Sequence, residues 1–132
     1  MNKRPSKECF VIMPFAKSFD GIWESVIRPV VTDFGDQCIR ADDISNVGNI
    51  LEDLTNSIRS ADYLIADLTS QNANVFYELG YAHALGKPVV LLTQSAGDVP
   101  FDLRPLRVIK YSDTASGAVQ LRDALNQFIS GV

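Results

Sequence analysis

The sequence is poor in the residues that metal and redox sites use. It has one histidine and two cysteines, Cys9 and Cys38, and no CxxC spacing, so no recurrent metal-binding pattern is present. The two cysteines lie in separate apolar runs, and we expect them to be reduced and buried rather than joined in a disulfide. The phosphate-loop and nucleophile motifs GxGxxG, GxxxxGK[ST] and GxSxG are also absent.

Features of membrane and nucleic-acid binding are missing as well. No apolar run approaches the ~18 residues that a transmembrane helix needs, and the N-terminus lacks the apolar segment of a signal peptide. Lys and Arg together number 12 against 16 Asp and Glu, which gives a net charge of −4. A surface that neutralises phosphates needs the opposite balance. We therefore expect a cytoplasmic protein that binds neither membranes nor nucleic acids.

The length and composition fit one globular domain. The 132 residues are 46% hydrophobic and 21% charged, which is ordinary for a soluble protein with a single core. We expect one domain over residues 1–132, in which residues 1–7, with the basic Lys3, Arg4 and Lys7, form a flexible arm.

Short apolar runs alternate with amphipathic stretches along the chain. Strands are predicted over residues 8–13, 37–41, 63–66, 88–93 and 106–111, and helices over residues 22–32, 49–60, 75–85 and 118–129. Pro29 is expected to kink the first of these helices or to end its regular part. Strand–helix alternation of this kind predicts an α/β fold, in which a parallel sheet lies between two layers of helices.

The central stretch from Ala61 to Gln94 reads as strand, loop, helix and strand. Glu78 lies early in that helix, at the border of the face that packs on the sheet. Asp67 ends the preceding strand, and open α/β sheets bind ligands outside the carboxyl ends of their strands. Glu78 is therefore a candidate site residue. The alternative is a glutamate that only complements the helix dipole.

The same stretch carries a family resemblance. Between Asp67 and Pro88, the strings DLT and NxNVFYELGYAHALGKP resemble bacterial domains related to nucleoside 2-deoxyribosyltransferases and to TIR domains. The string IMPF, which ends at Phe15, is similar to the family's first-strand motif. The resemblance covers residues 10–111 and implies five parallel strands in the flavodoxin-like order 2-1-3-4-5. That order places the loops of residues 13–20 and 67–74 on either side of one crevice.

By this resemblance, Glu78 occupies the position of a catalytic glutamate. A carboxylate can attack the anomeric carbon of an N-glycosidic bond or stabilise the cation that forms there, and a nearby helix N-terminus favours its ionised form. Where the deoxyribosyltransferases have an aspartate that serves the departing base, this chain has Asn72 or Asn74, which cannot donate a proton as an acid. This fits a leaving group that is already cationic, such as the nicotinamide of NAD. NAD is thus a possible substrate, and no cofactor is expected.

The other candidates for substrate binding each have a structural alternative. Asp67 could hold ribose hydroxyls or cap the following turn, and Asp42 could contact a ribose or form an Asx turn. Phe15 and Tyr77 could stack on a base or simply pack against the core. The expected substrate-binding residues are Pro14, Phe15, Asp20, Asp42, Asp67, Asn72, Asn74 and Tyr77.

Two classes of function remain open. The first, which we favour, is an enzyme that cleaves or transfers the N-glycosidic bond of a nucleoside or nucleotide. The second is a non-catalytic module for nucleotide binding or TIR-like signalling and assembly. The resemblance implies a homo-oligomer in either case, because the deoxyribosyltransferases complete their sites from a neighbouring subunit. A receiver-like domain is set aside, since Met13 and Pro14 replace the acidic pair that such a domain needs.

Overall fold

A five-stranded parallel sheet forms the centre of the molecule. The computed structural model describes residues 4–41, 50–103 and 106–132. The strands lie in the order β2-β1-β3-β4-β5, and every neighbouring pair is parallel. Their bounds are β1 (Glu8–Ile12), β2 (Gln37–Arg40), β3 (Tyr63–Asp67), β4 (Val89–Thr93) and β5 (Val108–Lys110). The predicted fold class and strand order are therefore confirmed.

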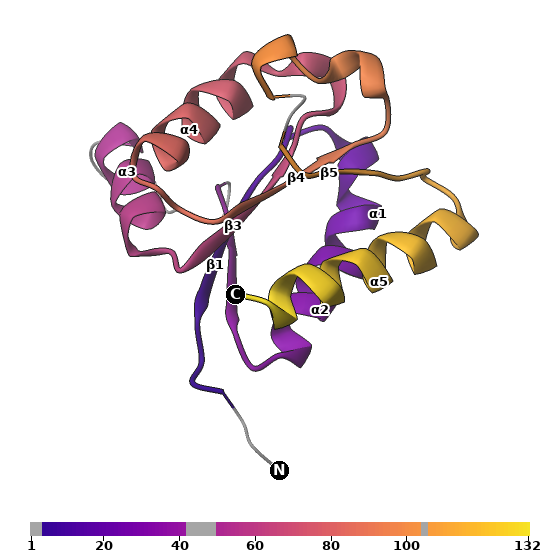
Figure 1. Cartoon of the computed structure of the whole chain (residues 1–132), viewed down its shortest axis with the longest axis horizontal. Helices are drawn as coiled ribbons and strands as arrows, with labels where there is room; N and C mark the ends of the chain where they lie inside the picture. Colours follow the sequence, from indigo (N-terminus) through magenta and orange to yellow (C-terminus); the bar gives the residue numbers. More distant parts are fainter. Residues whose placement is uncertain (1–3, 42–49, 104–105) are drawn as a thin grey trace.

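Helices cover both faces of the sheet (Figure 1). One face carries α1 (Asp20–Ile22), the π-helical segment η2 (Trp23–Ile27), α2 (Arg28–Asp33) and α5 (Ala115–Ser130). The other face carries α3 (Ile50–Ser60) and α4 (Ala73–Ala84). The described residues also contain the short turns η1 (Lys17–Phe19), η4 (Thr69–Gln71), η5 (Ala96–Asp98) and η6 (Phe101–Leu103). Within the three described ranges, no helix has the length and apolar character needed to cross a membrane.

The sheet divides the hydrophobic core into two parts. Successive side chains of a strand point to opposite faces, so Cys9 and Val11 of β1 pack under α2 and α5, whereas Phe10 and Ile12 pack under α3 and α4. The central β3 is buried along its whole length, as expected for a parallel strand covered on both sides. The centre of the sheet is thus covered on both faces.

The helical run after β1 is irregular ahead of Pro29. The sequence predicts that this proline kinks the helix or ends its regular part, yet the helix continues through it to Asp33. The irregularity lies in the preceding turn, where residues 23–27 adopt the wider π-helical form. A proline has no N–H to donate and its ring crowds the preceding turn, so a widened turn there is a physical way to keep the helix intact.

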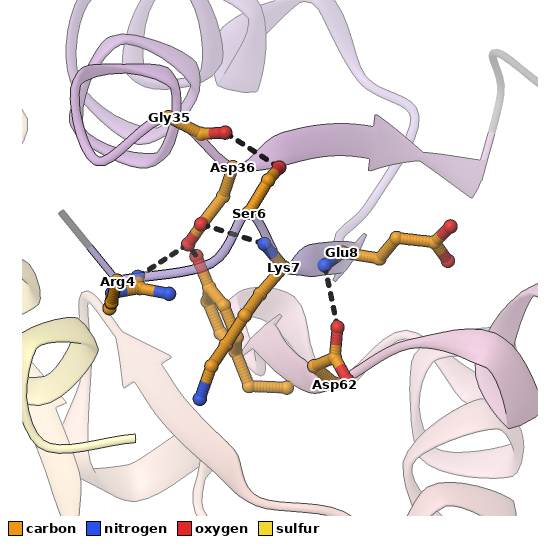
Figure 2. Close-up of polar contacts among 8 residues, drawn as sticks. Arg4, Ser6, Lys7, Glu8, Gly35, Asp36 and Asp62 are labelled. Carbon is orange, nitrogen blue, oxygen red and sulfur yellow. Dashed lines mark hydrogen bonds and ion pairs between the residues drawn. The ribbon is translucent and has the colours of Figure 1, made fainter.

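The N-terminal segment is held by side-chain hydrogen bonds (Figure 2). Arg4 Nη2 lies 2.6 Å from Asp36 Oδ2, and the Lys7 N–H donates to Asp36 Oδ1 at 3.0 Å. The Ser6 hydroxyl donates to the Gly35 carbonyl at 2.7 Å. Residues 4–7 belong to the arm that was expected to be flexible, and two of them, Arg4 and Lys7, satisfy the buried Asp36 carboxylate. Residues 1–3 of the predicted arm lie outside the described residues.

Candidate functional site

A cavity of about 300 Å³ opens where the chain leaves β1 and β3. One wall comes from the segment that follows β1, and the other comes from the start of α4. The lining residues are Met13, Pro14, Phe15, Ala16, Asn72, Asn74, Val75 and Glu78. The connection from β1 runs to β2 on one side and that from β3 runs to β4 on the other. The cavity thus lies at the point where the strand order reverses, which is where open α/β sheets bind ligands.

Glu78 is the ionisable group of this cavity. It lies in the second turn of α4, and 8% of its surface is exposed. Within the described residues, its carboxylate makes no hydrogen bond or ion pair, and burial raises its pKa to about 7. From the sequence, the nearby helix N-terminus was expected to favour the ionised form of this carboxylate. Burial outweighs that effect because the influence of the helix dipole falls off within the first turn.

Asn72 caps the helix that carries Glu78. Its backbone is extended, and its Oδ1 accepts hydrogen bonds from the N–H groups of Asn74 at 2.9 Å and Val75 at 3.3 Å. Side chains of this type satisfy the free N–H groups at the start of a helix. Because the oxygen serves the backbone, the NH₂ group of Asn72 remains as a donor. Asn72 and Asn74 thus offer amide groups, and no proton-donating acid, beside Glu78.

Asp67 is buried and does not line the cavity. It is 1% exposed, and its Oδ1 accepts from the N–H of Thr69 at 2.9 Å and from the Thr69 hydroxyl at 2.6 Å. Its Oδ2 accepts from the Tyr111 hydroxyl. Burial raises the pKa of Asp67, and these hydrogen bonds partly oppose the rise. The sequence left two roles open for Asp67, the binding of ribose hydroxyls and the capping of the following turn. Its hydrogen bonds from Thr69 match the second role.

The remaining candidates are spread over several places. Phe15 lines the cavity and is 63% exposed, whereas Tyr77 is 61% exposed and does not line it. Asp20 is exposed and lies 3.4 Å from Arg40 Nη1. Asp42 falls outside the described residues. The structure therefore brings five of the predicted residues to one cavity: Pro14, Phe15, Asn72, Asn74 and Glu78.

Sequence reasoning missed part of the lining. Met13 and Ala16 flank the predicted site residues Pro14 and Phe15, and their position in the same loop could have indicated that they line the cavity. Val75 was assigned to the stripe that packs on the sheet, and it does so while also lining the cavity. Outside the lining, no sequence feature indicated that the Tyr111 hydroxyl binds Asp67, because the two residues are 44 positions apart in the chain.

The lining restricts the chemistry of the cavity. Among the described lining residues, Glu78 is the only one with an ionisable side chain. The described ranges contain no group of three or more His, Cys, Asp and Glu side chains placed to hold a metal ion. A lone carboxylate beside amides and an aromatic ring can bind a positively charged or electron-poor group, or attack an electrophilic carbon.

Comparison with known sequences identifies the family. A sequence model of the nucleoside 2-deoxyribosyltransferase family matches residues 20–123, which is most of the chain. The chain belongs to this family. The matched range contains Asn72, Asn74, Val75 and Glu78 of the cavity. A comparison with curated proteins gave no match.

Solved structures of this fold include known nucleoside enzymes. The CMP N-glycosidase of Clostridium botulinum has a TM-score of 0.71 at 17% identity, over 90% of this chain and 99% of that one. A 2-deoxyribosyltransferase of Bacillus psychrosaccharolyticus has a TM-score of 0.65 at 16% identity, over 90% of each chain. The 2-deoxyribosyltransferase of Leishmania mexicana has a TM-score of 0.59 at 23% identity, over 85% of this chain and 76% of that one. At these identities the likeness shows the fold.

Membership in the deoxyribosyltransferase family sets the class of chemistry. It supports cleavage or transfer of an N-glycosidic bond on a nucleoside or nucleotide. The cavity lies at the ligand-binding edge of the same fold, so the two findings concern one part of the molecule.

Proposed function

We propose that this chain is an enzyme that cleaves or transfers the N-glycosidic bond of a nucleoside or nucleotide, with Glu78 as its catalytic carboxylate. The observation that carries this proposal is the place of Glu78, which is the one ionisable side chain among the described residues lining the cavity. Breaking an N-glycosidic bond develops positive charge at the anomeric carbon. A carboxylate beside that carbon either attacks it or stabilises the charge.

We propose further that the leaving base is cationic, as nicotinamide is in NAD. A neutral base usually needs a proton or strong hydrogen bonds as it departs, and the amides of Asn72 and Asn74 cannot supply a proton. A cationic ring needs none, because the electron pair of the broken bond neutralises it. Its charge would also lower the pKa of Glu78 on binding, which increases the fraction of Glu78 that is ionised at neutral pH.

The proposed reaction has two balanced steps. In the first, the bond between the anomeric carbon and the base nitrogen breaks, its electron pair stays on the base, and a Glu78 oxygen bonds to or stabilises the anomeric carbon. In the second, a water molecule or an acceptor attacks that carbon, loses a proton to solvent and releases the carboxylate. Water gives hydrolysis, whereas a second base or a hydroxyl gives transfer.

The size of the cavity favours assembly of like chains. A volume of about 300 Å³ is at the lower end for ligand pockets, and it is small for a dinucleotide. Phe15 at the cavity and Tyr77 on α4 expose 63% and 61% of their surfaces. We propose that a second copy covers these rings and encloses the substrate. The same observation favours the alternative function, a non-catalytic nucleotide-binding or TIR-like assembly module.

The test is base release measured by liquid chromatography. The wild type, Glu78→Gln and the control Glu24→Gln, an exposed glutamate of η2, are incubated with NAD and with a panel of neutral nucleosides and nucleotides. We expect the wild type and the control to release base, with NAD as the preferred substrate, and Glu78→Gln to release at least about a hundredfold less. Equal release by Glu78→Gln would contradict the proposal. Ligand binding without release would favour the alternative module.

A further inference from the structure

A hydrogen-bond network joins the carboxyl ends of three neighbouring strands. Tyr111 directly follows β5, Gln94 follows β4, and Asp67 is the last residue of β3. The Gln94 Nε2 donates to the Tyr111 hydroxyl at 3.1 Å, and that hydroxyl donates to Asp67 Oδ2. The Gln94 N–H donates at 3.0 Å to the Thr69 hydroxyl, which itself donates to Asp67 Oδ1. The network thus connects β4 and β5 to the turn that follows β3.

The centre of the network is buried and lies apart from the cavity. Asp67 and Tyr111 are 1% and 3% exposed, and neither lines the cavity. If one donor to such a buried carboxylate is lost, an acceptor oxygen is left without a hydrogen bond, which costs stability. Neither residue is placed to touch a substrate in the cavity, and any effect on turnover must pass through other residues.

The turn that the network holds has an unfavourable backbone. Ser70 and Gln71 have φ values of 70° and 53°, a region that residues other than glycine adopt only when their surroundings hold them there. The Thr69 N–H and hydroxyl are both bound to Asp67. The Ser70 N–H donates to Asp98 Oδ2 of η5 at 2.9 Å. These contacts fix η4 at both its first and second residues.

The turn leads directly into the cavity wall. Asn72 follows Gln71 and caps α4 through the N–H groups of Asn74 and Val75. Asn72, Asn74, Val75 and Glu78 all line the cavity. A shift of η4 would therefore move the cap and the first turns of the helix that carries the carboxylate. In enzymes, misplacements of this kind reduce the rate even when they originate away from the reacting atoms.

We infer that Asp67 and Tyr111 are positioning residues, which hold η4 so that Asn72 and Glu78 keep their places in the cavity. The effect on turnover rests on the proposed function, but the effect on η4 does not. A purely structural role is the alternative. In that case, loss of the Tyr111 hydroxyl would lower the stability of the whole domain without loosening η4 more than other segments.

A matched tyrosine separates these two roles. The hydroxyl of Tyr63 donates at 2.7 Å to Asp36 Oδ2, and both residues are buried. This pair lies at the opposite, amino end of the sheet, where Asp36 also binds Arg4 and Lys7 (Figure 2). Tyr63→Phe and Tyr111→Phe therefore remove the same atom from the same kind of buried pair, and only the second variant concerns η4.

The experiment combines amide hydrogen exchange with steady-state kinetics. We expect Tyr111→Phe to exchange the amides of Thr69, Asn74 and Val75 at least about tenfold faster than the wild type. We expect its kcat for base release to fall about tenfold, with a KM that changes far less. Tyr63→Phe should leave both quantities near the wild-type values. Wild-type protection of these amides in Tyr111→Phe, or equal loosening in Tyr63→Phe, would overturn the inference.

A second pair of variants covers the case in which Tyr111→Phe does not fold. Thr69→Val keeps the side-chain shape but removes the hydroxyl that binds Asp67 and Gln94. Thr69→Ser keeps this hydroxyl. We expect Thr69→Val to show the faster exchange and the lower kcat, and Thr69→Ser to restore both. Identical behaviour of the two variants would overturn the inference.

Failure of the proposed function would look different. In that case Glu78→Gln would release as much base as the wild type, or neither protein would release any. The exchange measurement needs no substrate, so it would still decide whether Asp67 and Tyr111 hold η4.

Discussion

At the scale of the residue, Glu78 combines burial with the absence of a counter-charge among the described residues. Its pKa is raised to about 7, because burial removes the carboxylate from water and no described residue supplies a partner. Such a group costs stability whenever it is ionised. We interpret this cost as a consequence of keeping a carboxylate ready for a positively charged transition state.

The raised pKa of Glu78 also predicts how the free energy of unfolding depends on pH. In the unfolded chain Glu78 loses its proton near pH 4.5, whereas in the folded protein it keeps the proton up to about pH 7. Between these values the folded state binds more protons, so this group lowers stability as pH rises. We expect Glu78→Gln to be more stable than the wild type at about pH 8, by up to about 3 kcal/mol.

Urea unfolding at two pH values measures this effect. At about pH 4 the Glu78 carboxyl is mostly protonated in both states, and the two proteins should unfold at nearly the same urea concentration. A Glu78→Gln variant that is no more stable than the wild type at about pH 8 would contradict the assignment of a raised pKa to this carboxyl.

At the scale of the element, the start of α4 determines the shape of the site. Asn72 both caps this helix and lines the cavity. Another helix offers a comparison, because Thr114 caps α5 by accepting from the Gly117 N–H at 3.0 Å. The two caps make the same kind of contact, and only one of them lies at the cavity.

Removal of each cap should therefore separate stability from activity. We expect Asn72→Ala and Thr114→Ala each to lower the free energy of unfolding by about 1 kcal/mol. Only Asn72→Ala should also lower kcat, since it alone disturbs the cavity wall. Chemical denaturation and base release measure the two effects. Equal losses of turnover in both variants would show that the cap acts on activity only through general stability.

The sequence could predict the elements but not the turn between them. The helical spacing of Val75, Glu78 and Leu79 was enough to place Glu78 at the border of the buried face, where the structure has it. The left-handed backbone of Ser70 and Gln71 could not be foreseen, because neither is a glycine and their conformation depends on distant partners.

At the scale of the whole molecule, the strand–helix alternation predicted the α/β fold, and the family resemblance implied the strand order. β3 is buried throughout, whereas β5, which ends in the exposed Lys110, lies at the sheet edge. Contacts between strands that are far apart in sequence could not be predicted in the same way. The Tyr111–Asp67 pair depends on the sheet having already formed.

The proposed assembly is a prediction at this scale. If a second copy covers Phe15 and Tyr77, the protein should have the mass of an oligomer in light scattering. Tyr77→Lys should shift it toward the monomer, because a charge replaces an exposed ring that the interface would bury. The matched control is Val119→Lys, at an exposed apolar residue of α5. This variant should leave the mass unchanged. A wild-type monomer would contradict the proposed assembly.

The most direct test of the central claim is the pH dependence of kcat/KM for base release, because this quantity reports the pKa values of the free enzyme. If the ionised Glu78 acts on the anomeric carbon, kcat/KM should rise with pH and level off above about pH 7. The Glu78→Gln variant should show little activity at any pH. A flat profile across this range, or an unchanged profile in Glu78→Gln, would contradict the assignment of Glu78 as the catalytic carboxylate.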